Sequence, residues 1–418
     1  MKYYSLNEFN IIKKNSKEFV LESVNGLEIE LDKKGALFFF LLDGAYTDKF
    51  EKIVKENGID DDYKELLENL IKIRFIEIKN GDSSIPFDRK IAIKNIDNIE
   101  KGPLTLQELS ITLSDACPLN CTYCFRKMDN IRGRLNRETV KKIILDFRKL
   151  AGITLNISGG EPSVFADEVS FCAKFARENG VKYISVNSSG FGLTREKLIN
   201  WKDSGIECIN LSFDTLKEEY SEKLLGRKDG VKNCLNVVKW AGEIGLFVHI
   251  NLTLTDKNYQ EIENFKEILM RKNISMRVNP YVPLSEMDTI SPMIIKKGYE
   301  IVEKMRKKGI PIYIPIDENE NYPEAFLCSG GLTRATVENN GKIGGCQFLM
   351  SKYGPKGNVV DNGLYKLWLE GNFQVFRDES EKPMEQCKEC NLRPFCIGNC
   401  LAVHVGLSKA ENYCPLDK

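Results

Sequence analysis

Between residues 106 and 315, short apolar runs alternate with longer amphipathic stretches. The runs predict strands at Leu109–Leu113, Ile153–Ile157, Tyr183–Val186, Cys208–Phe213, Phe247–Leu254, Ile274–Val278 and Ile310–Ile314. The amphipathic stretches predict helices at Arg137–Leu150, Glu168–Glu178, Thr194–Asp203, Gly230–Ile244, Tyr259–Lys272 and Pro292–Lys307. Repeated units of this kind indicate parallel strands with right-handed crossovers. Six or so units without a full closing set predict an α/β fold built on a partial (β/α)6 barrel.

The segments on either side of this region follow other patterns. Residues 1–85 predict a small α+β, winged-helix-like domain with a hairpin around Asn25-Gly26. Its expected elements are strands Phe19–Val24 and Leu27–Leu31, helices Lys33–Leu42, Thr47–Asn57 and Asp60–Ile73, and strand Phe75–Ile78. Residues 86–105 are expected to be a linker, since Gly, Asp, Pro and Asn recur between Asp82 and Pro103. Residues 316–418 are poorer in periodic structure and rich in Cys and Gly, and are expected to form a third domain.

Composition narrows the class of protein. The 418 residues carry 60 basic and 60 acidic side chains, so no broad electrostatic attraction to nucleic acid is implied. The longest apolar run, Ala36–Leu42, is too short to span a membrane, and the amino terminus has no apolar signal core. We therefore expect a cytoplasmic protein. In that compartment its 13 cysteines are unlikely to form disulfides.

Three of these cysteines directly follow the first predicted barrel strand. Cys117, Cys121 and Cys124 can hold three irons of a 4Fe–4S cluster and leave the fourth iron open for chemistry. A structural zinc site would normally close with a fourth ligand. This C-x3-C-x2-C spacing resembles that of the radical S-adenosylmethionine (radical SAM) enzymes. The resemblance implies reductive cleavage of S-adenosyl-L-methionine at this cluster, which gives a 5′-deoxyadenosyl radical and methionine.

Further motifs at predicted strand ends resemble the cofactor contacts of the same family. Ser158-Gly159-Gly160-Glu161-Pro162 follows the second strand and resembles the motif that binds the methionine amino group, with Glu161 as acceptor. The resemblance places Tyr123 beside the adenine and Asn187 and Ser188 near the ribose. It places Ser212 and Arg227 at the methionine carboxylate. For each of these last four residues, a solvated loop or a cap is the alternative interpretation.

The carboxy-terminal cysteines read Cys328-x12-Gly341-x4-Cys346, then Cys387-x2-Cys390-x5-Cys396-x3-Cys400, then Cys414. This order resembles the seven-cysteine SPASM domain, which binds two auxiliary 4Fe–4S clusters and brings the expected total to three. The resemblance assigns Cys387, Cys390, Cys396 and Cys414 to the second auxiliary cluster. It assigns Cys328, Cys346 and Cys400 to the first, where one iron would lack a cysteine. A pair of zinc knuckles is the alternative.

Residues 1–85 resemble the PqqD-like element with which peptide-modifying enzymes recognise a leader sequence. We expect its exposed strand edge near Phe19–Val24, beside the helix Lys33–Leu42. Together the resemblances imply a radical SAM/SPASM maturase that forms a thioether cross-link in a ribosomally made precursor peptide. Its electron donor would be a flavodoxin or ferredoxin.

Three alternatives to this function stay open. A sulfatase-maturing enzyme that makes formylglycine would share the barrel and the cluster domain but would not need residues 1–85. A maturase could also form a carbon–carbon cross-link. A non-enzymatic metal-sequestering or peptide-binding protein would require the Gly-Gly-Glu-Pro motif to be accidental.

Overall fold

The computed structural model describes residues 2–56, 63–81, 106–126, 133–281, 292–313, 330–350, 356–369 and Phe373, with short gaps at 7–8, 14–17, 24–27, 43–44, 74, 125 and 332. The predicted linker 86–105 and most of the carboxy-terminal cysteines lie outside these residues.

A nine-stranded sheet forms the centre of the molecule, in the order β12-β11-β10-β9-β8-β7-β6-β13-β14. Seven strands, β6 to β12, are parallel and adjacent in chain order, which confirms the predicted α/β partial barrel. Their bounds are β6 Glu108–Thr112, β7 Thr154–Ser158, β8 Tyr183–Ser188, β9 Cys208–Ser212, β10 Phe247–Leu254, β11 Ile274–Pro280 and β12 Ile312–Tyr313. Within the described residues the sheet stays open, with β12 at one edge and β14 at the other.

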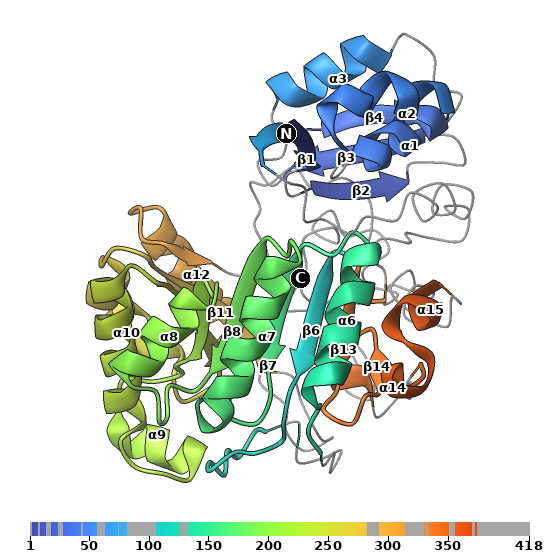
Figure 1. Cartoon of the computed structure of the whole chain (residues 1–418). Coiled ribbons are helices and arrows are strands. Elements are labelled where there is room, and N and C mark those ends of the chain that lie inside the picture. The colour runs from blue at the N-terminus through green and yellow to red at the C-terminus, as the bar shows by residue number, and fades with distance from the viewer. Residues whose placement is uncertain are drawn as a thin grey trace.

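Helices cover one face of this sheet (Figure 1). They are α6 Arg137–Lys149, α7 Ala166–Glu178, α8 Arg195–Asp203, α9 Glu218–Leu225, α10 Gly230–Ile244, α11 Lys266–Leu269 and α12 Pro292–Arg306, with 3-10 turns η3 Pro162–Phe165 and η4 Tyr259–Phe265. The predicted helices are confirmed, although the stretch from Tyr259 is mostly a 3-10 turn. Helix α9 was not predicted.

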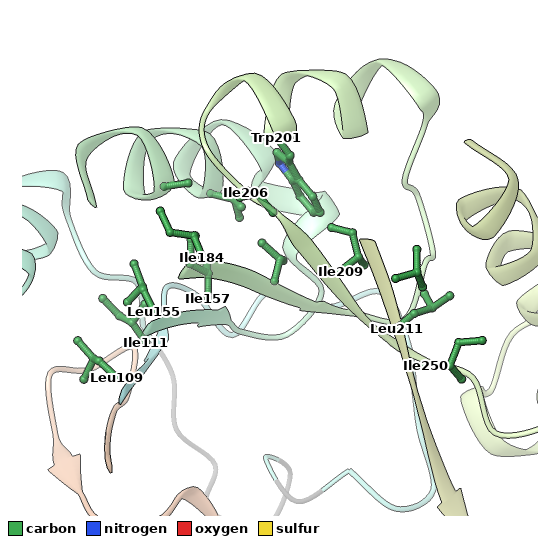
Figure 2. Packing of buried hydrophobic residues seen from close by; sticks show 14 of the residues in the cluster. Leu109, Ile111, Leu155, Ile157, Ile184, Trp201, Ile206, Ile209, Leu211 and Ile250 are labelled. Atoms are coloured by element: carbon green, nitrogen blue, oxygen red, sulfur yellow. The ribbon is translucent and has the colours of Figure 1, made fainter. Parts of the chain in front are cut away.

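The covered face carries the apolar side chains of every strand. Leu109, Ile111, Leu155 and Ile157 are fully buried, and the same alternation continues through β8 to β11. Figure 2 shows these residues pointing toward the helices, with Trp201 of α8 packed over Ile184 and Ile209. Because strand side chains alternate between the two faces, this arrangement leaves the polar positions on the other face.

The inner, concave face of the sheet is therefore polar. It carries Asn156, Ser185, Asn210 and Asn251, all partly buried. Adjacent side chains bond across the strands: Asn210 donates to Ser185 at 3.2 Å, and Ser185 donates to Asn156 at 3.4 Å. Closed (β/α)8 barrels fill this space with bulky apolar residues, whereas here the face suits a polar ligand.

His249 and Arg277 lie on the same inner face. His249 Nδ1 bonds Ser275 Oγ at 2.8 Å, and burial together with the nearby Arg277 charge lowers the pKa of His249 to about 4. The strand register puts Ser212, Asn251 and Arg277 side by side in one row. At neutral pH, His249 is therefore uncharged, while the exposed Arg277 brings a positive charge to this part of the face.

The described residues of the amino-terminal domain form two small sheets and three helices. Strands β2 Phe9–Lys13, β3 Glu18–Ser23 and β4 Glu28–Asp32 form one sheet, and β1 Lys2–Leu6 pairs with β5 Ile76–Asn80. The helices are α1 Lys33–Leu42, α2 Phe50–Glu56 after the 3-10 turn η1 Thr47–Lys49, and α3 Tyr63–Lys72. These confirm the predicted hairpin and helices, but β1 and β2 were not predicted.

The expected exposed edge at Phe19–Val24 is wrong. Strand β3 is the central strand of its sheet, and β2 and β4 bond it from both sides in antiparallel register. Its backbone groups are already paired, so it has no edge to offer a peptide. Within the described residues the edges of this sheet are β2 and β4.

The amino-terminal domain lies at the amino ends of the barrel strands (Figure 1). Ile153, directly before β7, is 5% exposed and belongs to the same apolar cluster as Phe39 and Phe75 of that domain. The cysteine loop follows the opposite, carboxyl end of β6. The amino-terminal domain and the cysteine loop therefore lie at opposite ends of the barrel strands.

After the barrel, the part of the chain that the structure describes contains two short strands and two helices. Strands β13 Arg334–Val337 and β14 Ile343–Gly344 form a hairpin, and helices α14 Val359–Asn362 and α15 Leu364–Leu369 follow the 3-10 turn η5 Gln347–Leu349. Strand β13 pairs in parallel with β6, so the central sheet continues into the third domain. No helix in the described part of the chain combines the length and apolar composition needed to cross a bilayer.

Candidate functional site

The predicted cluster loop lies at the carboxyl end of β6, the edge at which parallel sheets bind ligands. Cys117 is exposed, and Cys121 and Cys124 are partly buried. Among the described residues, no three Cys, His, Asp or Glu side chains converge as the ligands of a single metal ion would. In a 4Fe–4S cluster each cysteine binds a different iron, so the thiolates do not need to share one centre.

The Gly159-Gly160 motif packs against this loop. The Gly160 amide donates to the Ser114 carbonyl, and the Glu161 amide donates to the Ala116 carbonyl, both at 2.8 Å. A Cβ atom on Gly160 would lie 2.3 Å from the Ala116 oxygen, and one on Gly159 would lie 2.7 Å from the Ser114 oxygen. The glycines are thus required because the loop's own backbone occupies the space of a side chain.

Glu161 is 1% exposed, and its carboxylate joins the ends of β7 and β8. Oε1 accepts from the Ser163 amide at 3.1 Å and the Ser188 hydroxyl at 2.7 Å. Oε2 accepts from the Ser189 amide at 2.9 Å and the Ser189 hydroxyl at 2.6 Å. Four donors thus satisfy both oxygens, and a ligand ammonium would replace one of the two rotatable hydroxyls.

The end of α9 holds the middle of the cysteine loop. The Asn120 amide donates to the Leu225 carbonyl and the Thr122 amide donates to the Leu224 carbonyl, both at 2.9 Å. The helix ends at Gly226, whose φ of +67° is left-handed. This contact fixes the loop on the side away from the glycine motif.

Arg227, which is expected at the methionine carboxylate, contacts the cysteine loop. Its Nη1 donates to the Pro118 carbonyl at 3.2 Å, and its guanidinium lies 4.8 Å from the centre of the Phe191 ring. The side chain is exposed, so part of the planar group faces solvent. It therefore lies at the loop edge, where a carboxylate could still approach it.

Tyr123 makes a buried hydrogen bond that the sequence did not predict. Its hydroxyl donates to Asp214 Oδ2, and Asp214 Oδ1 accepts from the Thr253 amide at 2.7 Å. Burial raises the pKa of Tyr123, and the Asp214 charge raises it further. Burial also raises the pKa of Asp214, while the bonds from Tyr123 and Thr253 oppose the rise. Asp214 thus joins the loop to the ends of β9 and β10.

The remaining predicted cofactor residues fall on different sides of the sheet. Ser188 faces the helix side and bonds Glu161. Asn187 and Ser212 lie on the inner face, paired in register with Asn210 and Asn251. The structure therefore brings Ser188 to the glycine motif, and places the other two where a ligand in the concave face would meet them.

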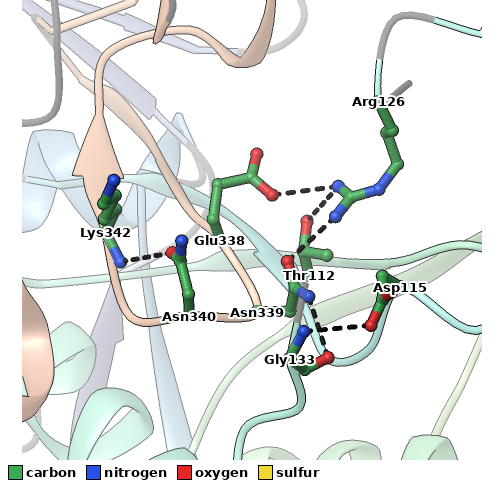
Figure 3. Close-up of polar contacts among 8 residues, drawn as sticks. All are labelled: Thr112, Asp115, Arg126, Gly133, Glu338, Asn339, Asn340 and Lys342. Atoms are coloured by element: carbon green, nitrogen blue, oxygen red, sulfur yellow. Dashed lines mark hydrogen bonds and ion pairs between the residues drawn. The ribbon is translucent and has the colours of Figure 1, made fainter. Parts of the chain in front are cut away.

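Arg126, two residues after Cys124, links the loop to the third domain (Figure 3). Its guanidinium donates to Glu338 Oε2 at 2.9 Å, Asn339 Oδ1 at 3.0 Å and Thr112 Oγ1 at 3.2 Å. The side chains of Arg126 and Glu338 are only 12% and 2% exposed. Removal of one partner of such a buried pair typically costs about 3–5 kcal/mol.

The network continues to the far side of the loop. Asn339 Nδ2 donates to the Gly133 carbonyl at 2.8 Å, and the Gly133 amide donates to Asp115 Oδ1 at 3.1 Å. The sequence could not indicate this pairing, because 212 residues separate Arg126 from Glu338.

Of the seven carboxy-terminal cysteines, the structure describes Cys346, which is partly buried just after β14. The other predicted ligands, Cys328, Cys387, Cys390, Cys396, Cys400 and Cys414, lie outside the described residues. Their assignment to two auxiliary clusters stays a prediction.

The chemistry of the loop suits an iron–sulfur cluster. It offers three thiolates and a backbone fixed on three sides by Gly160, α9 and Arg126. Residues 111–269 match the radical SAM superfamily, and residues 328–391 match SPASM, an iron–sulfur cluster-binding domain. The chain carries a radical SAM domain followed by a SPASM domain.

Relatives and solved structures extend this result. The radical SAM chain is 26% identical over 303 residues to the PqqA peptide cyclase of Rhizobium meliloti, a match covering 69% of this chain and 80% of that protein. Streptococcus suis SuiB, solved with its precursor peptide SuiA, shares the fold with a TM-score of 0.73 at 17% identity over 98% of this chain and 97% of its own. The anSMEcpe structure with bound AdoMet has a TM-score of 0.58 at 16% identity and covers 73% of this chain and 97% of its own.

These matches indicate an enzyme that uses S-adenosylmethionine and iron–sulfur clusters. The SuiB likeness includes the amino-terminal domain, since it spans nearly the whole chain, whereas the anSMEcpe likeness leaves out more than a quarter. The described part of the chain therefore shares the fold of SuiB.

Proposed function

We propose that this enzyme modifies a ribosomally made precursor peptide and forms a thioether cross-link between a cysteine sulfur and a carbon of that peptide. The observation that carries the proposal is the polar inner face beside the cysteine loop, in a chain whose likeness to SuiB covers 98% of its length. SuiB was solved with a precursor peptide, and the sequence relatives are named peptide cyclases.

In this proposal the cluster and its cofactor bind at the carboxyl edge of the sheet. Cys117, Cys121 and Cys124 would hold the cluster, and Glu161 would receive the methionine ammonium when the Ser188 or Ser189 hydroxyl turns away. When bound together, the cluster and S-adenosylmethionine would supply reductive cleavage of that cofactor and a radical that abstracts hydrogen from the peptide. Gly159 and Gly160 keep the loop in place, and Tyr123 anchors it to Asp214.

The other predicted cofactor residues fit the same site. Asn187 and Ser212 face the concave side, where the ribose and the carboxylate would lie. Arg227 would reach the carboxylate from the loop edge, since its guanidinium is exposed. The peptide would then occupy the rest of the inner face, whose amide and hydroxyl groups can pair with peptide backbone.

The amino-terminal domain would recognise the leader of the precursor as a PqqD-like element. An extended peptide can add to a free sheet edge, which gives affinity through main-chain hydrogen bonds. Because β3 is central, we propose the β4 edge, near which α3 lies: the Tyr63 hydroxyl approaches Asp32 at the end of β4. This replaces the expected edge at Phe19–Val24.

The SPASM domain would bind two auxiliary 4Fe–4S clusters, for three in total. Cys328, Cys346 and Cys400 would leave one iron of the first cluster open to a substrate thiolate, which suits carbon–sulfur bond formation. Electrons would come from a flavodoxin or ferredoxin, and the enzyme would work in the cytoplasm.

A second candidate is a carbon–carbon cross-link. The curated relatives are named peptide cyclases, a name that fits a ring closed by a carbon–carbon bond as well as one closed by a thioether. Formylglycine formation has less support, since an enzyme of that kind would not need residues 1–85, whose described part forms strands and helices here.

The test uses full-length protein loaded with iron and sulfide without oxygen. It should bind about twelve irons per chain, and release 5′-deoxyadenosine from S-adenosylmethionine when reduced. It is then incubated with each short peptide encoded beside its gene, above all those rich in cysteine. A mass loss of two hydrogen atoms with loss of one alkylatable thiol identifies a thioether.

The other outcomes separate the alternatives. The same mass loss with every thiol still alkylatable identifies a carbon–carbon bond. An aldehyde captured by a hydrazide reagent identifies formylglycine. Iron-loaded protein that forms no 5′-deoxyadenosine would overturn the enzymatic proposal.

A further inference from the structure

The cysteine loop and the third domain meet at the tip of one hairpin. Strand β13 runs parallel to β6, so its carboxyl end, Val337, lies at the edge from which the cysteine loop leaves. The turn that follows carries Glu338 and Asn339, and β14 then returns antiparallel to β13. The tip of this hairpin is where Arg126 binds (Figure 3).

The base of the same hairpin carries a predicted cluster ligand. Gly344, the last residue of β14, pairs with Thr336, and Cys346 follows two residues later. The same hairpin thus binds Arg126 at its tip and leads along the chain into Cys346.

The contact at the tip is specific in geometry. One guanidinium reaches Glu338, Asn339 and Thr112, the last of which is the final residue of β6. A lysine ammonium has no such planar fork and could not reproduce these directions. Since the carboxylate is 2% exposed, water provides little alternative solvation for either charge.

We infer that Arg126 and Glu338 are positioning residues that fix the radical SAM cluster loop on the auxiliary-cluster hairpin and cancel each other's charge beside it. The pair sets one separation between the two cluster sites. Because Glu338 neutralises the charge of Arg126, no uncompensated positive charge from this arginine lies beside the radical SAM cluster. The inference depends on the clusters and not on the peptide or on the bond formed.

The charge of Arg126 should affect the reduction potential of the radical SAM cluster in a definite direction. Reduction adds an electron, so a nearby uncompensated cation favours the reduced cluster and raises its potential. Glu338→Gln leaves Arg126 charged without its partner, whereas Arg126→Gln combined with Glu338→Gln leaves no charge. The potential should rise in the single variant and return toward the wild-type value in the double variant.

The separation between the clusters should affect their magnetic coupling. Arg126→Lys keeps the charge but loses the fork, so the potential should stay close to wild type while the loop is held less firmly. Magnetic coupling between the reduced clusters, seen in the electron paramagnetic resonance spectrum, should weaken or broaden in this variant. The control is Glu243→Gln, which breaks a pair with Arg195 at 3.2 Å on the outer helices, where the carboxylate is 42% exposed.

The experiment uses the full chain loaded anaerobically, with iron content measured for every variant. A redox titration follows the cluster whose spectrum changes when S-adenosylmethionine is added. The inference holds if Glu338→Gln shifts the potential upward beyond the Glu243→Gln control, the double variant reverses the shift, and Arg126→Lys changes only the coupling. It is overturned if Glu338→Gln matches the control, if the shift persists in the double variant, or if Arg126→Lys leaves the coupling unchanged.

Discussion

At Gly160 the backbone of the cysteine loop occupies the place of a side chain. A Cβ atom there would lie 2.3 Å from the Ala116 oxygen, and backbone cannot rotate away as a side chain can. We expect Gly160→Ala to cost about 3 kcal/mol or more of unfolding free energy, and to lower the iron bound by the loop. Denaturant unfolding and iron analysis measure the two effects.

Gly242 provides the matched control for this substitution. It lies inside α10, and a Cβ atom on it would have no neighbouring atom within 4 Å. Gly242→Ala should be neutral or gain about 0.5–1 kcal/mol, with full iron content. Equal effects of the two substitutions would contradict the packing argument.

Loss of the hydrogen bond between Tyr123 and Asp214 should change the stability of the protein in a pH-dependent way. Burial raises the pKa of Asp214 above its ordinary value, so its unfavourable contribution appears as pH rises through the folded-state pKa and vanishes in acid. Tyr123→Phe removes a bond that lowers this pKa, so the variant should lose about 1–3 kcal/mol at neutral pH. The deficit should shrink as the pH falls, which unfolding at several pH values measures.

Tyr220→Phe is the control for pH dependence. Tyr220 bonds the neutral Thr255 hydroxyl at 3.0 Å, so its loss should cost about 1 kcal/mol at every pH. A Tyr123→Phe deficit that is equally independent of pH would show that Asp214 does not titrate differently in the variant.

The sequence predicted which single residues belong to motifs, but not which distant residues they bond. The motif predicted that Glu161 would be special, and the structure shows why it needs Ser188 and Ser189 beside it. Asp214 stood next to a predicted residue but received no role, because its partner Tyr123 is 91 residues away. Pairings of this kind depend on the closed fold, which no local pattern contains.

At the scale of elements, α9 holds the cysteine loop through its last turn. Gly226 ends the helix with φ +67°, and a Cβ atom there would lie 2.9 Å from Asn120 Cβ. Gly226→Ala should therefore combine left-handed strain of about 1 kcal/mol with displacement of the loop. We expect reduced iron binding and reduced 5′-deoxyadenosine formation.

Gly245 ends α10 in nearly the same conformation, with φ +73°, but its nearest neighbour is the flexible Lys202 Nζ at 3.6 Å. Gly245→Ala should show the strain alone and keep its iron. If both variants lose iron equally, strain and not the contact with the loop is responsible.

Periodicity predicted the long elements well and the short ones poorly. Both β10 and α10 have the predicted bounds, because eight and fifteen residues give a clear alternation or stripe. Strand β13 has four residues and β14 has two, too few for a pattern. Missing β2 had a larger consequence, since it made β3 look like an edge.

At the scale of the whole molecule, the amino-terminal domain and the cysteine loop lie at opposite ends of the barrel strands. A leader bound to that domain would raise the local concentration of the attached core peptide to the millimolar range. Deletion of residues 1–85 should spare S-adenosylmethionine cleavage but lose most peptide modification at low substrate concentration. High concentration should restore it.

The deletion needs one accompanying change. Ile153 is 5% exposed only because the amino-terminal domain covers it, so the truncated chain should carry Ile153→Thr to avoid an exposed apolar side chain. Full-length Ile153→Thr is the control. A folded, iron-loaded truncation that modifies precursor as efficiently as the intact chain would reduce the domain to a structural cap.

The pairing of β6 with β13 also affects folding during synthesis, because the two strands are made at different times. Glu108 and Arg334, partners in this register, are 226 residues apart in the chain. At about 5–20 residues per second, β6 leaves the ribosome roughly 10–45 s before β13 does. During this interval one edge of β6 is bare and open to pairing with other chains. During the same interval Arg126 is still without its partner Glu338.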